Sequence, residues 1–71
     1  MSAVERYEIK LDGGRTLHQL SNEDKLYGFL TIEADGRARV WRQTWSDSYA
    51  PTDDVFPGFV SAARALLEGR V

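Results

Sequence analysis

The sequence predicts a two-layer α+β domain, in which a four-stranded antiparallel β-meander carries one C-terminal α-helix on one face. Three patterns lead to this prediction: a hairpin-like stretch around Asp35-Gly36, a second hairpin-like stretch before it, and an apolar stripe at helical spacing near the end. A chain of 71 residues is expected to form a single small domain. The predicted sheet covers about residues 5–45, followed by a loop over 46–56 and a helix over about 57–68.

The central hairpin is expected over residues 26–45. Asp-Gly between two runs of β-branched and aromatic residues favours a two-residue type I′ turn. With that turn, Leu30 lies opposite Trp41, and side chains alternate between the two faces. The predicted core face carries Leu26, Leu30, Ile32, Trp41 and Trp45, and the opposite face carries Tyr27, Phe29, Val40 and Arg42. A slip of one residue moves side chains to the other face, so the assignment depends on the turn.

The first hairpin is expected from the alternation over residues 6–11, the turn residues Asp12-Gly13-Gly14, and a short return strand over 16–20. A two-residue loop places His18 and Leu20 on the face of Ile9. A three-residue loop instead brings Leu17 inward, and the sequence leaves both open.

The C-terminal part is read as an irregular loop followed by a helix. Ala50-Pro51 disfavours helix before the proline, whereas Pro57 suits a first helical turn and Gly69 a helix end. The helix and the sheet together predict a core of Tyr7, Ile9, Leu11, Leu20, Leu26, Leu30, Ile32, Trp41, Trp45, Phe56, Phe59, Val60, Ala63, Leu66 and Leu67.

Composition narrows the classes of function. The net charge of −2 disfavours bulk electrostatic attraction to nucleic acid or to an anionic membrane. The chain has no cysteine, which excludes disulfides and thiolate metal sites. It shows neither a signal-peptide pattern nor an apolar run of membrane-spanning length, so we expect a cytoplasmic protein without membrane partners or cofactors.

Residues for catalysis or metal binding are sparse. His18 is the only histidine, no nucleophile-elbow spacing occurs, and no metal-ligand spacing occurs. The paired acids Glu23-Asp24 and Asp53-Asp54 are expected in solvated loops, where the second pair favours a helix N-terminus. We therefore predict no enzyme, no catalytic residue and no metal site. An enzyme active only within a complex remains an alternative, and it requires His18.

A protein-binding surface is the function that the pattern favours. One helix covers one face of the sheet, which leaves the face of Tyr27, Phe29, Val40 and Arg42 without a partner in the chain. Tyrosine, phenylalanine and arginine are typical of interface hot spots. Tyr49 in the acidic stretch is expected to add a contact, so the predicted partner-binding residues are these five and the partner is another protein or a second copy. A stacked Phe29–Arg42 pair is the purely structural alternative.

The alternative function is binding of single-stranded nucleic acid through strand 37–45. Arginines interleave with tryptophans there, as on sheets that stack bases, and the residues are Arg37, Arg39, Trp41, Arg42 and Trp45. The predicted register argues against it, because it turns both tryptophans toward the core.

The small size, the acidic charge and the lack of a catalytic constellation make the chain similar to phage-encoded inhibitors such as anti-CRISPR proteins. That resemblance implies a regulatory protein that inhibits a partner protein. A tryptophan-bearing strand followed by one helix also resembles, in outline, the adaptor proteins of nonribosomal peptide synthetases. The spacing of Trp41 and Trp45 departs from that pattern, and nothing is carried over from it.

Overall fold

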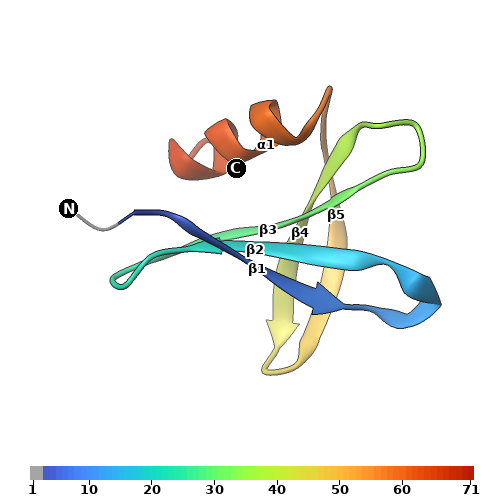
Figure 1. Ribbon diagram of the computed structural model, residues 1–71, viewed down its shortest axis with the longest axis horizontal. Coiled ribbons are helices and arrows are strands. Elements are labelled where there is room, and N and C mark those ends of the chain that lie inside the picture. The colour runs from blue at the N-terminus through green and yellow to red at the C-terminus, as the bar shows by residue number, and fades with distance from the viewer. Residues whose placement is uncertain (1–2) are drawn as a thin grey trace.

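A computed structural model describes residues 3–71, which form one antiparallel sheet with a helix on one of its faces (Figure 1). In chain order the elements are β1 (Glu5–Lys10), the short 3-10 turn η1 (Asp12–Gly14), β2 (Thr16–Ser21), β3 (Leu26–Ile32), β4 (Ala38–Trp45), β5 (Ser48–Phe56) and α1 (Phe59–Leu67). Each strand pairs with its neighbours in sequence, so the sheet is a meander. The predicted α+β class is confirmed, but the sheet has five strands instead of four.

The fifth strand replaces the loop that was predicted over residues 46–56, so that prediction is wrong. β5 turns back from β4 through Ser46-Asp47 and pairs along it, for example Gln43 with Tyr49. Pro51 lies within β5 although it has no N–H to donate. It is tolerated because β5 is an edge strand, where one side of the backbone needs no partner.

The predicted register of the central hairpin is wrong by one residue. Leu30 lies opposite Val40, and Phe29 lies opposite Trp41. The loop is longer than the two residues expected, because Glu33 N–H donates to Arg37 O at 2.7 Å and Gly36 N–H donates to Glu33 O at 2.9 Å. Gly36 takes a φ of +90°. A turn followed by a left-handed glycine, not a type I′ turn, therefore closes the hairpin.

The shifted register gives the sheet an apolar cluster on each face. The cluster under α1 consists of Leu20, Leu30, Ala38, Val40, Ala62 and Leu66. The cluster on the far face consists of Leu17, Phe29 and Trp41, with Ile9, Leu11 and Tyr49 packed against it. The three-residue loop at η1, left open above, is the one that forms, and it turns Leu17 inward opposite Ile9.

Several residues of the predicted core are exposed, so the core prediction is wrong for them. The predicted core residues that are exposed are Tyr7, Leu26, Ile32, Trp45, Val60 and Leu67. The register accounts for part of this result, because the residues opposite Leu26, Ile32 and Trp45 differ from those expected. Trp45 is 77% exposed because it lies at the end of the β4–β5 hairpin, beyond both clusters.

The helix is shorter than the predicted range of 57–68. α1 begins after Gly58, which has extended backbone and makes no side-chain cap hydrogen bond. At the other end, Gly69 has a φ of +72°, and Arg70 N–H donates to Ala65 O at 2.9 Å. This is a Schellman closure, and it confirms the prediction that Gly69 terminates the helix.

Candidate functional site: a cleft where two strands diverge

β3 and β4 stay together over only four residue pairs. The ladder runs from Ile32 opposite Ala38 to Phe29 opposite Trp41 and then stops. Beyond that point β3 continues beside β2, whereas β4 continues beside β5 and leaves the rest of the sheet, as Figure 1 shows. Within residues 3–71, segments 26–28 and 42–45 therefore have a ladder partner on one side only.

A β-bulge lies at the start of this divergence. Leu20 pairs with Gly28 and Ser21 pairs with Leu26, which leaves Tyr27 as an extra residue in β3. Asn22 Nδ2 donates to the Tyr27 hydroxyl at 3.2 Å, and so helps to hold the bulged residue. Bulges bend a strand and increase its twist, which explains why β3 turns away from β4 here.

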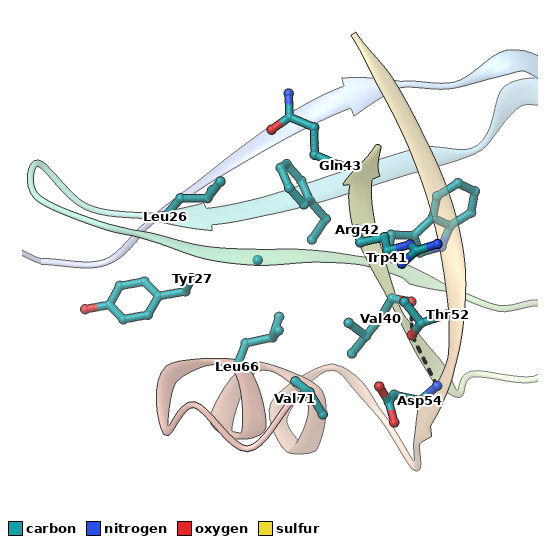
Figure 2. A pocket seen from close by; sticks show the side chains of 12 residues that line it. Leu26, Tyr27, Val40, Trp41, Arg42, Gln43, Thr52, Asp54, Leu66 and Val71 are labelled. Carbon is teal, nitrogen blue, oxygen red and sulfur yellow. Dashed lines mark hydrogen bonds between the residues drawn. The ribbon is translucent and has the colours of Figure 1, made fainter. Parts of the chain in front are cut away.

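The divergence opens a cleft of about 320 Å³ that extends to the end of α1 (Figure 2). Leu66 and Val71 face it from the helix side, and Val40 lies on the opposite wall. Gly28 contributes bare backbone to the cleft. Leu26 and Tyr27 line its β3 side. The interior of the cleft is therefore largely apolar.

Polar groups lie at the β5 side of the cleft. The Thr52 hydroxyl donates to Val40 O at 2.8 Å and accepts from Asp54 N–H at 3.2 Å. Arg39 Nη1 donates to Thr52 O at 2.8 Å. These bonds fix the irregular part of β5 and present the carboxylate of Asp54 in the cleft lining together with Arg42. Among the described residues none forms an ion pair with Arg42, so its guanidinium is available to a ligand.

The backbone of β4 also offers hydrogen bonds to the cleft. Arg37, just before β4, accepts at its O from the N–H of Glu33, just after β3, whereas Val40 O faces β5 and accepts from Thr52. Along a strand, successive residues direct their N–H and C=O groups to opposite sides. By this alternation Trp41 and Gln43 point toward β3. At Gln43 β3 has already departed, so its backbone groups face the open cleft.

The predicted partner-binding residues are brought together only in part. Tyr27, Val40 and Arg42 line the cleft, and Phe29 is also among its lining residues, whereas Tyr49 is not. Phe29 is only 4% exposed and packs with Tyr49 on the far face, with ring centroids 5.0 Å apart. The expected single face is therefore wrong, and so is the expected pairing of Phe29 with Arg42, because Phe29 lies opposite Trp41.

No local pattern in the sequence indicates the remaining lining residues. Leu26 was expected in the core, and Leu66 was expected to be covered by the sheet. Thr52 and Asp54 were expected in a loop. These four residues come together only because β3 and β4 diverge and β5 forms. Both features depend on tertiary structure and not on local sequence.

Strand 37–45 does not display a row of stacking residues. Trp41 is buried and donates from Nε1 to the Thr31 hydroxyl at 2.8 Å. Arg39 pairs with Glu33 at 2.6 Å. Arg37 pairs with Asp35 at 2.7 Å. Trp45 alone of the two tryptophans is exposed.

His18 packs under the start of α1, with its ring edge-on to Phe59 at 6.0 Å between centroids. Its Nδ1 is buried without a hydrogen-bond partner. Burial lowers the pKa of His18, and the positive charge of Arg6 lowers it further. Within residues 3–71 no three histidine, aspartate or glutamate side chains gather in a way that could hold a metal ion. In the same part of the chain no helix has the length and apolar character needed to cross a membrane.

Comparison with known proteins gives no relative to draw on. No protein-family model matches the chain, and searches of curated proteins and of solved structures find no significant similarity.

Proposed function

We propose that this chain is a non-enzymatic protein-interaction module that holds an extended segment of a partner protein in the cleft between β3 and β4. The observation that carries the proposal is the free edge of β4 at Gln43, which opens directly into an apolar cleft. Extended peptides add to exposed sheet edges through main-chain hydrogen bonds, and neighbouring pockets select their side chains.

The lining of the cleft suggests what the partner segment looks like. Side chains of an added strand alternate, so every second one faces α1. An apolar side chain in that position contacts Val40 and Leu66. The guanidinium of Arg42 and the carboxylate of Asp54 then favour a segment with charged or polar groups beside the apolar residue. Such a segment would be masked while bound, and in this way a small module acts as an inhibitor or regulator of its partner.

Selection from a random-peptide display library on the immobilised protein tests the proposal without knowledge of the partner. Leu26→Asp places a charge in the cleft, and Leu26 is already 48% exposed. Ile32→Asp is the matched control, because Ile32 is 44% exposed on the same strand but does not line the cleft. We expect selected peptides to bind wild type and Ile32→Asp equally and to bind Leu26→Asp at least about tenfold more weakly, a loss of about 1.4 kcal/mol.

Amide chemical shifts in ¹⁵N-labelled protein then locate the bound peptide. The proposal expects the largest changes at residues 26–28 and 42–44. Failure to enrich any peptide over the bare support contradicts the proposal. Peptides that bind both variants alike, or that shift amides elsewhere, contradict it as well.

A further inference from the structure

Two aspartates of the chain are each followed by glycine, at Asp12-Gly13 and at Asp35-Gly36. An aspartyl-glycine bond can rearrange without an enzyme. The glycine nitrogen attacks Cγ of the protonated aspartic acid, and the carboxyl hydroxyl leaves with the amide proton as water, which produces a cyclic succinimide. Water then adds to this ring. Where it opens the bond between the nitrogen and the former main-chain carbonyl, the chain continues through the side-chain carbonyl and the residue is an isoaspartate.

The structure holds Asp35 in a state that resists this reaction. Its Oδ1 accepts from Arg37 N–H at 3.1 Å, and its Oδ2 accepts from Arg37 Nε at 2.7 Å. The hydrogen bond from the N–H, together with the one from the guanidinium, lowers the pKa of Asp35, so the protonated carboxyl that the attack requires is scarcer. The nucleophile is engaged as well, because Gly36 N–H donates to Glu33 O at 2.9 Å.

Asp12 lacks these restraints. Within residues 3–71 its carboxylate takes part in neither a side-chain hydrogen bond nor an ion pair. Asp12 is exposed at the start of η1, and Gly13 and Gly14 follow with φ values of +81° and +79°. A Cβ atom at either glycine would meet no atom within 4 Å, so open space surrounds this backbone. Two successive glycines also give the loop more conformational freedom than other residues allow.

We infer that Asp12-Gly13 is a site of spontaneous isoaspartate formation and that the fold protects Asp35-Gly36 from the same reaction. The product has an additional methylene group in the main chain. This group lies within the loop that Leu11 N–H closes by donating to Arg15 O at 2.8 Å. Because this loop sets the register between β1 and β2, the modification acts on the first hairpin and is independent of the function proposed for the cleft.

Peptide mapping of protein that has been incubated near neutral pH measures the reaction at each site. Trypsin places the two aspartates in separate peptides, 11–15 and 26–37, whose isoaspartate forms are resolved by chromatography and by electron-transfer fragmentation. In the folded protein we expect Asp12 to isomerise at least about tenfold faster than Asp35, which must first give up hydrogen bonds to a charged group. The same incubation in urea is the matched control. Unfolding removes those hydrogen bonds, so the two rates should become similar.

Two variants assign the effect to the named groups. Asp12→Glu keeps the charge but can form only a larger ring, so the product at this site should disappear. Arg37→Ala removes the guanidinium and should raise the rate at Asp35 severalfold while the rate at Asp12 stays the same. Equal rates at the two sites of the folded wild type would overturn the inference. An Asp12 that isomerises in urea but not in the folded protein would overturn it as well.

Discussion

Gly28 of β3 lies directly beneath Leu66 of α1, so closely that a Cβ atom on residue 28 would lie 2.6 Å from Leu66 Cδ2. The backbone of Gly28 also has a φ of +154°, which side-chain-bearing residues rarely adopt. The contact sets how far the end of α1 descends onto the sheet beside the cleft.

Gly28→Ala should therefore lower the free energy of unfolding by about 1–3 kcal/mol, the usual cost of overpacking. Leu66→Ala alone should cost about 2–5 kcal/mol. Together they should cost less than the sum, because the smaller residue at 66 relieves the clash at 28. Urea unfolding of the two single variants and the double variant measures this coupling. Strictly additive changes would show that the two residues do not meet.

The hydrogen bond from Trp41 Nε1 to Thr31 gives a second prediction. Both residues are buried, at 6% and 3% exposure. Thr31→Val keeps the shape of the side chain but leaves the indole N–H without an acceptor, which costs about 1–3 kcal/mol. Thr31→Ser retains the hydroxyl and should cost less in the same urea experiment. Equal losses in both variants would mean that the methyl group, and not the hydrogen bond, matters.

His18 should make the stability of the fold depend on pH. Burial, with Arg6 and Lys10 nearby, lowers the pKa of His18 below 6.5 in the folded state, although Glu8 opposes this. The unfolded state then binds a proton first as the pH falls. Stability is complete above pH 6.5 and decreases as the pH falls from there toward the pKa of the folded state.

Replacement of His18 by glutamine provides the matched comparison, because glutamine does not titrate. Urea unfolding between pH 5 and 8 should show a decrease on the acid side for wild type and a smaller decrease for His18→Gln. A loss of the same size in both proteins would assign the pH dependence to the carboxylates.

The two tryptophans should be distinguishable by fluorescence. Trp45→Phe leaves Trp41, which is buried and should emit at shorter wavelength with little quenching by acrylamide. Trp41→Phe leaves Trp45, which is 77% exposed and should emit at longer wavelength with strong quenching. Equal quenching of the two variants would show that the register of β4 is wrong. Quenching of Trp45 by oligonucleotides at low salt would revive the nucleic-acid alternative.

The class of fold was predictable because hydrophobic periodicity and turn residues are local signals. Alternation identified β1, and the helical stripe identified α1. The register was not predictable, because Asp35-Gly36 is compatible with turns of different length. The outcome depends on whether Gly36 alone, or both residues, adopt positive φ. Pro51 is the reason for the wrong prediction of a loop over residues 46–56. A proline favours a loop unless it lies in an edge strand, and the sequence does not show which strand is at the edge.

The candidate site was only partly predictable for a related reason. Tyr27, Val40 and Arg42 were identified from an argument about an uncovered face, and they do line a common cleft. Phe29 was included in the same argument but is buried, so Phe29→Asp should unfold the protein instead of probing its surface. The contributions of Leu66 and Val71 depend on how α1 packs on the sheet, and the close contact between Leu66 and Gly28 is a tertiary feature that the helix sequence alone does not reveal.

The meander also determines how this chain reaches its structure. No connection between successive strands within residues 3–71 is longer than five residues, so each strand finds its neighbour close by in the chain. The loop-closure entropy of each step is correspondingly small, which favours rapid folding for a protein rich in β-structure. The strands can then pair one after another, in chain order from β1 to β5. The helix, which follows them, closes only one of the two apolar clusters, so the cluster of Leu17, Phe29 and Trp41 can form before α1 docks.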